Sequence, residues 1–220
     1  MRAVEKLLTT KRVLAHLSRD YTPVAMYQSF CAEDIVLAHL IYSDLVHTEY
    51  KNIHMFTIDT GRTPDEIYLA IESLQQRYGN VLTVYHPDSN ELQTFGAEHG
   101  FNKNYYWQSI AIRFNRPLQR ALEGKNAWIS TGTLGHNAAT TNNPGIHSLN
   151  RDKALISWDS KHQLPCFNPL VRWTQEEIRN YARHHGLPLL DLETVPHGSS
   201  IQNQIFESTP ESYPEAVGLG

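Results

Sequence analysis

Cysteine is scarce in this sequence, with two among 220 residues, Cys31 and Cys166. A four-thiolate iron–sulfur cluster or structural zinc site needs more thiols than the chain has, so both are excluded. The two cysteines form no C-x-x-C pair, which excludes redox chemistry that uses that motif. The 12 histidines show no H-E-x-x-H spacing, so we expect no resident metal.

Long apolar runs are also missing. No stretch approaches the roughly 20 residues that cross a bilayer, and the first six residues lead into an amphipathic pattern rather than a signal-peptide core. The net charge of −4 argues against a broad basic face for nucleic acid, although it leaves room for a local anion pocket. We therefore expect a cytoplasmic protein that binds neither membranes nor nucleic acid directly.

The composition suits one globular domain, since 40% of the residues are hydrophobic and the length allows a sizeable core. Short apolar runs alternate with helical periodicities, which predicts an α/β fold with a doubly wound, mostly parallel sheet. We place this domain at 1–190 and a C-terminal tail at 191–220. The predicted helices are 3–19, 33–47 and one beginning near Pro64, and the predicted strands are 24–27, 52–58, 81–85 and 125–130, with further strands near 154–158 and 166–170.

The segment between the third and fourth strands has a weaker pattern. Residues 86–101 are polar and interrupted by glycine, which predicts a loop with a short helix. The aromatic run 105–107 could stack on a base, but such runs more often belong to the core, and we assign it to the core.

Residues 29–34 join the first strand to the following helix. A strand that ends in a tight turn and opens a helix points backbone N–H groups at one spot, where the helix dipole favours an anion. Glu33 and Asp34 suit the first turn of that helix as dipole partners. The turn lacks the glycines of a Walker loop. From spacing alone, an ordinary capped helix is the more frequent explanation and a phosphate site is the alternative.

Residues 59–62 follow the second strand. Ligands of open parallel sheets lie beyond the carboxyl ends of the strands, and both turns fall there. Helix capping by Asp59 and Thr60, with Arg62 as a solvated surface residue, is the alternative explanation. The order of the two turns favours a nucleotide site.

Three segments, in order, resemble the phosphoadenylyl-sulfate and adenylyl-sulfate reductases, a branch of the PP-loop nucleotide α-hydrolase superfamily. Residues 29–34, Ser-Phe-Cys-Ala-Glu-Asp, resemble that family's Ser-Phe-Gly-Ala-Glu-Asp loop. Residues 58–62, Ile-Asp-Thr-Gly-Arg, resemble its Leu-Asp-Thr-Gly-Arg, and residues 168–188 resemble its Asn-Pro-Leu, Trp-Thr and His-x-x-Pro segment. The resemblance runs from about Val24 to Pro188, and it is more specific for fold than for activity.

The resemblance implies a site for an adenine nucleotide, such as a phosphoadenylyl or adenylyl sulfate, ATP or an AMP-like molecule. It also implies homodimers and Mg²⁺ that arrives with the nucleotide. Asp34 and Asp59 are the candidates to contact either this Mg²⁺ or the ribose. Arg113 and Arg116 fit anion contacts, although a solvated helix face explains them equally well. The nucleotide-binding residues implied are Ser29, Phe30, Cys31, Ala32, Glu33, Asp34, Asp59, Thr60, Gly61, Arg62, Thr131 and Gly132.

The chain departs from the family where substrate sulfate and catalysis are concerned. The family's two arginines after Thr131-Gly132 are missing. Residues 108–110 lack the cysteine pair of the family members that carry an iron–sulfur cluster. Val217 stands where the family has its nucleophilic cysteine. That thiolate attacks the sulfur of the adenylyl sulfate, which a valine cannot do. From the family resemblance we therefore expect a protein of sulfate assimilation, but one that does not use the standard reductase mechanism. The alternatives are a PP-loop ATP pyrophosphatase or adenylyltransferase, and a non-catalytic nucleotide-binding subunit.

Overall fold

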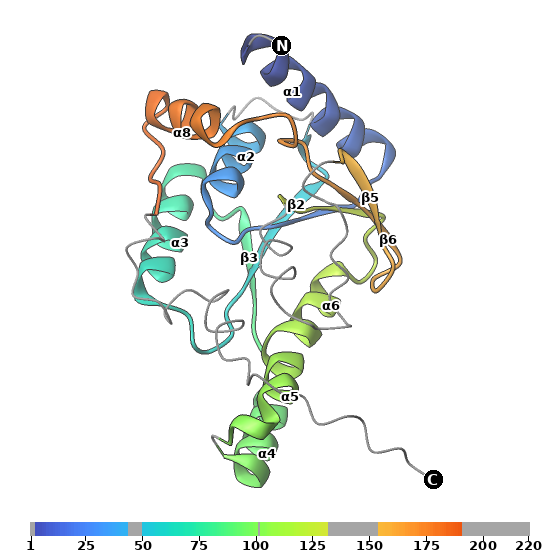
Figure 1. The fold of residues 1–220 in the computed structure, drawn as a ribbon, viewed down its shortest axis with the longest axis vertical. Coiled ribbons are helices and arrows are strands. Elements are labelled where there is room, and N and C mark those ends of the chain that lie inside the picture. Colours follow the sequence, from blue (N-terminus) through green and yellow to red (C-terminus); the bar gives the residue numbers. More distant parts are fainter. Residues whose placement is uncertain (1–2, 44–49, 101, 132–153, 191–220) are drawn as a thin grey trace.

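The computed structural model describes residues 3–43, 50–100, 102–131 and 154–190 (Figure 1). Their centre is a six-stranded sheet in the order β3-β2-β1-β4-β6-β5. Every pairing is parallel except that of β5 with β6. The prediction of a doubly wound, mostly parallel sheet is therefore confirmed. The strands are β1 (Val24–Tyr27), β2 (Ile53–Ile58), β3 (Leu82–Tyr85), β4 (Ala127–Ile129), β5 (Ile156–Asp159) and β6 (Leu164–Phe167).

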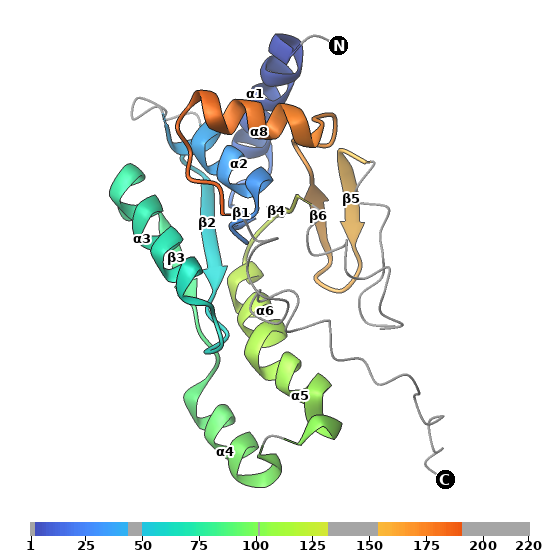
Figure 2. The same ribbon diagram turned by 60° about the vertical axis from the view of Figure 1, so that its left-hand side comes forward.

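Helices cover both faces of the sheet (Figures 1 and 2). One face carries α1 (Ala3–Asp20), α2 (Ala32–Tyr42), α3 (Asp65–Tyr78) and α8 (Gln175–His184). The opposite face packs against α6 (Arg116–Leu122). None of the described helices is long and apolar enough to cross a membrane.

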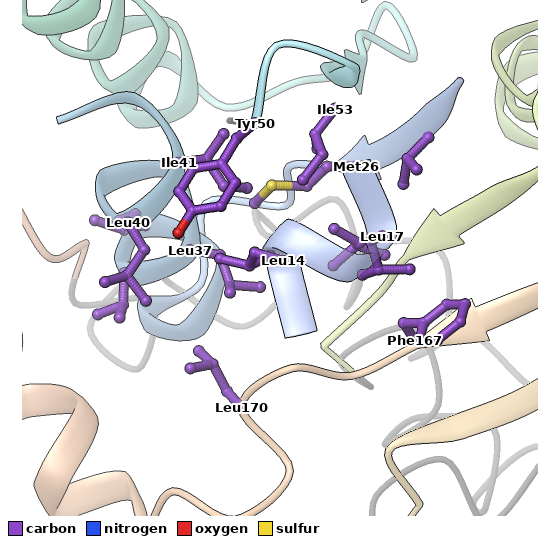
Figure 3. Packing of buried hydrophobic residues seen from close by; sticks show 14 of the residues in the cluster. Leu14, Leu17, Met26, Leu37, Leu40, Ile41, Tyr50, Ile53, Phe167 and Leu170 are labelled. Carbon is purple, nitrogen blue, oxygen red and sulfur yellow. The ribbon is translucent and has the colours of Figure 1, made fainter. Parts of the chain in front are cut away.

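The main core lies between the sheet and the first of these helical layers (Figure 3). Leu14 and Leu17 of α1 meet Met26 of β1 and Leu37 of α2, and all four side chains are 0% exposed. The strand β1 is buried along its whole length, as expected for a central parallel strand covered on both faces. This packing fixes the carboxyl end of β1, where the candidate nucleotide loop begins.

Of the two predictions about the segment 86–107, one is confirmed and one is wrong. The expected short helix is α4 (Ser89–His99), with Asp88 as its N-cap. The assignment of the aromatic run 105–107 to the core is wrong, because these side chains are only partly buried. They lie where α5 (Tyr106–Ile110) joins α4 at the end of the molecule away from α1 (Figures 1 and 2), and Tyr105 stacks on His99 with ring centroids 3.9 Å apart.

A continuous helical rod runs from α5 into α6 through a π-helical turn, Ala111–Asn115. Pro117 explains this interruption, because it has no N–H to donate to the carbonyl of Arg113, four residues earlier. The backbone N–H of Arg116 donates instead to the carbonyl of Ala111. Such turns are frequent at functional sites, and this one carries Arg113.

The helix expected at 33–47 is α2, which ends at Tyr42, and residues 44–49 lie outside the described residues.

Candidate functional site

The loop after β1 is built on a residue in the left-handed region. Phe30 has a φ of +65°, and its side chain, 2% exposed, packs with Met55 and Ile67 beneath the loop. The buried Gln28 side chain accepts a hydrogen bond from the N–H of Phe30 at 3.0 Å and donates to the carbonyl of Asp34 at 3.3 Å. The Phe30 side chain therefore anchors the loop from below, and its direct contact with a nucleotide stays a prediction.

Asp34 holds the same loop together from within. Its carboxylate accepts hydrogen bonds from the N–H and Oγ of Ser29 at 2.8 and 2.5 Å, and from Thr131 Oγ1 at 2.7 Å. Burial raises the pKa of this carboxyl group, and the bonds from Ser29 and Thr131 oppose that rise. Asp34 thus ties the β1 loop to the carboxyl end of β4, and its oxygens are already engaged before any ligand arrives.

The start of α2 carries no side-chain cap. Cys31 is the N-cap residue but its side chain accepts no capping hydrogen bond, and its sulfur lies 3.7 Å from Thr131 Oγ1. Burial, followed by the charges of Asp34 and Glu33, raises the pKa of this thiol well above its usual value. Glu33 accepts a hydrogen bond from Gln175 of α8, and Ala32 is half-buried. A helix N-terminus without a side-chain cap is suited to an anion.

The loop after β2 is closed around Asp59. One carboxylate oxygen accepts from the N–H of Gly61 and the hydroxyl of Thr63, both at 2.8 Å, and the other accepts from the hydroxyl of Tyr68 at 2.9 Å. Burial alone would raise the pKa of Asp59, but these hydrogen bonds and the nearby His86 outweigh it, and the pKa lies below its usual value. Asp59 therefore shapes the turn, whichever ligand binds there.

Two arginines lie at this turn, Arg62 within it and Arg113 from another element. Arg113 reaches from the π-helical segment and donates to the carbonyl of Thr60 at 2.8 Å. Gly61, with a φ of +72°, leaves so little room that a Cβ there would lie 3.2 Å from Arg113 Nη1. Burial and then the charge of Arg62 lower the pKa of Arg113. Arg113 Nε is buried without a hydrogen-bond partner in the described part of the chain.

The structure thus brings most of the predicted residues to the carboxyl ends of three adjacent strands, β2, β1 and β4. Arg116 is the exception, because its guanidinium pairs with Glu91 of α4 at 2.7 Å. Gly132 and Val217 lie outside the described residues. No group of three or more histidine, cysteine or acidic side chains among the described residues is arranged to hold a metal ion.

Two residues that organise the site were not predicted from sequence. Gln28 is 0% exposed and its amide fixes the first loop, and Tyr68 supports the carboxylate of Asp59 from within α3. A polar amide that ends a fully apolar strand was a signal for Gln28, because a buried amide needs partners. Tyr68 gave no such signal, because it stands nine positions from its partner on a largely exposed helix face.

Comparison with known proteins identifies a family. The Phosphoadenosine phosphosulfate reductase domain matches residues 23–194. The Adenosine 5'-phosphosulfate reductase of Allochromatium vinosum is 27% identical over 194 residues, covering 85% of this chain and 69% of that protein. Adenosine 5'-phosphosulfate reductase 2 of Bacillus subtilis is 29% identical over 228 residues, covering 97% and 86% respectively.

Solved structures show the same fold at low sequence identity. A phosphoadenylyl-sulfate (PAPS) reductase from Candida auris, solved as a phosphate complex, superposes with a TM-score of 0.62 at 17% identity over 82% of this chain and 81% of that one. The U34-tRNA thiolase NcsA from Methanococcus maripaludis has a TM-score of 0.53 at 16% identity over 93% and 71%. Because the family match spans most of the chain and the sheet has the same architecture, the protein belongs to the phosphoadenosine phosphosulfate reductase family of the PP-loop superfamily.

Proposed function

We propose that the carboxyl ends of β1, β2 and β4 bind an adenine nucleotide of the adenylyl-sulfate class. The observation that carries the proposal is the position of Arg113, whose guanidinium reaches the turn beside Gly61, close enough to Arg62 that burial and then the charge of Arg62 lower the pKa of Arg113. Like charges that lie near one another repel, and a bound oxyanion offsets that repulsion.

The second anchor is the uncapped start of α2. Ser29 and the first amides of this helix suit a phosphate, while Asp34 keeps the loop in shape. Two anion-attracting centres at neighbouring strand ends fit a ligand with two separated charged groups. The reductases to which the chain is similar are named for such a substrate.

Calorimetry with adenylyl sulfate, AMP and inorganic sulfate tests the proposal. We expect Arg62→Gln and Arg113→Gln each to weaken binding about tenfold or more, since a charge-assisted hydrogen bond contributes about 1.5–3 kcal/mol. Arg12→Gln, an exposed arginine on α1, is the matched control and should bind as the wild type does. Equal affinity in all four proteins, or no binding of any adenylate, rejects the proposal.

We further propose that this chain does not reduce its nucleotide by the standard thiolate attack. Both cysteines of the sequence are buried, Cys166 inside β6 and Cys31 at the start of α2, where the pKa of the thiol is raised. A buried thiol with a raised pKa is a poor nucleophile at neutral pH. We expect no thioredoxin-dependent release of sulfite from adenylyl sulfate or from phosphoadenylyl sulfate. Robust sulfite release would contradict this prediction, and loss of that activity in Cys31→Ala would identify Cys31 as the reacting thiol.

The pyrophosphatase alternative finds less support in the site. Hydrolysis of ATP between its phosphates needs Mg²⁺ held by carboxylates, but Asp34 and Asp59 already accept three hydrogen bonds each. A non-catalytic nucleotide-binding role is compatible with the same loops. Pyrophosphate release from ATP and Mg²⁺ distinguishes the two, and we expect none.

A further inference from the structure

The first turn of α3 contacts both loops of the proposed nucleotide site through neighbouring residues. Ile67 is 5% exposed and packs with Phe30 beneath the loop after β1. The hydroxyl of Tyr68 donates a hydrogen bond at 2.9 Å to the carboxylate of Asp59, in the loop after β2. One helical turn is therefore fastened to both anion-attracting centres, namely the start of α2 and the turn after β2.

Tyr68 differs from the other donors to the Asp59 carboxylate. The N–H of Gly61 and the hydroxyl of Thr63 belong to the same loop as Asp59, so they shape the turn but do not fix its position relative to α3. His86 Nδ1, at 3.6 Å from the carboxylate, is too far away for a hydrogen bond. Among the described residues, Tyr68 is thus the one hydrogen-bond donor to this carboxylate from outside the loop.

Core packing holds the helix that carries Tyr68. Ile67 and Leu74, which are 5% and 7% exposed, pack α3 into the same buried cluster as Phe30. The Tyr68 side chain itself is 43% exposed. Removal of its hydroxyl therefore leaves no cavity in the core, and its effect is confined to the loop that the hydroxyl holds.

We propose that Tyr68 is a positioning residue that sets the spacing between the two anion-attracting centres and thereby favours a ligand with two charged groups. The inference rests on the proposed nucleotide site and adds a determinant of its specificity. A ligand that spans both centres gains from a spacing that is fixed in advance, because ordering a loop during binding costs conformational entropy. A ligand with one charged group engages one centre and is insensitive to the spacing.

Calorimetry of Tyr68→Phe with adenylyl sulfate and AMP tests the proposal. We expect the affinity for adenylyl sulfate to fall about three- to tenfold, which corresponds to the ordering of about one side chain. The affinity for AMP, which lacks the sulfate group, should stay at the wild-type value. Tyr78→Phe is the matched control, because it removes a hydroxyl from the other end of the same helix, where that group lies 3.0 Å from His39 Nδ1. It should leave both affinities unchanged.

A double variant tests whether Tyr68 acts through Asp59. In Asp59→Ala the hydroxyl has lost its acceptor, so the addition of Tyr68→Phe should lower the affinity for adenylyl sulfate no further. If Asp59→Ala does not fold, the comparison of Tyr68→Phe with Tyr78→Phe decides.

Three results would overturn the inference and leave the proposed nucleotide site in place. They are an unchanged affinity of Tyr68→Phe for adenylyl sulfate, an equal loss of affinity for AMP, and an equal loss in Tyr78→Phe. Equal losses from Tyr68→Phe with and without Asp59→Ala would also overturn it. A wild-type protein that binds neither ligand would reject the proposed site and this inference together.

Discussion

Gly61 combines a backbone requirement with a steric one. Its φ of +72° is strained for any side chain, and an added Cβ would lie 3.2 Å from Arg113 Nη1. We expect Gly61→Ala to cost about 1–2 kcal/mol of folding free energy and to weaken nucleotide binding by displacing the guanidinium. Urea unfolding and calorimetry measure the two effects.

Gly186→Ala is the matched control for Gly61→Ala. Gly186 has a φ of +58°, and no described atom lies within 4 Å of the position that a Cβ would take there. A similar loss of stability with unchanged nucleotide affinity is therefore expected. If both variants bind the nucleotide equally well, the close approach of Arg113 to the turn has no role in binding.

Asp59 makes the turn after β2 sensitive to acid. The pKa of Asp59 is lowered in the folded state. Its charged form therefore stabilises the protein at pH values above the usual pKa of about 3.9. This stabilisation is lost as the pH falls through the pKa that Asp59 has in the folded protein. We expect Asp59→Asn to lower the free energy of unfolding by about 1–3 kcal/mol at neutral pH. The difference from wild type should shrink below about pH 4. A constant difference in urea unfolding across this range would contradict the assignment.

The helix α1 is an integral element of the core although it precedes the first strand. Leu14 is 0% exposed and packs between the sheet and α2, whereas Leu8 on the same helix is 50% exposed (Figure 3). We expect Leu14→Ala to cost about 2–5 kcal/mol and Leu8→Ala to stay within about 0.5 kcal/mol. Similar losses for both in urea unfolding would show that α1 does not pack as the structure has it.

The elements around the site are tied to one another across the fold. Thr131, which follows β4, donates a hydrogen bond to Asp34 at the start of α2. Gln175 of α8 donates one to Glu33, and Arg113 donates one to the loop after β2. These contacts join segments more than 50 residues apart. They keep the loops in place before a ligand binds, which reduces the conformational entropy lost on binding.

For the whole molecule, ligand binding should appear as added stability. A nucleotide at a hundred times its dissociation constant stabilises the folded state by about 2.7 kcal/mol, which raises the melting temperature by roughly 5–10 °C for a chain of this size. A thermal-shift screen of adenosine phosphates and sulfates measures it. The absence of any shift at concentrations that saturate related nucleotide sites would leave a structural role for these loops.

Several parts of the architecture could be predicted from the residues alone. The buried strand 24–27 and the helix after it each carry a local signal, namely an apolar run and a pair of acidic residues in the first helical turn, and the structure has both elements. The order of these elements predicted the parallel sheet, because right-handed crossovers leave few alternatives. Local periodicity and turn chemistry therefore determined which elements form and in which class of fold.

Only the tertiary structure decided what each polar residue does. Asp34 and Asp59 brace their own loops, and their contact with a ligand stays a prediction. Arg116 pairs with Glu91 of α4, whereas Arg113 lies at the turn after β2. The contacts of Arg113 with Thr60 and of Thr131 with Asp34 join distant segments, and sequence spacing within one segment carries no record of such contacts.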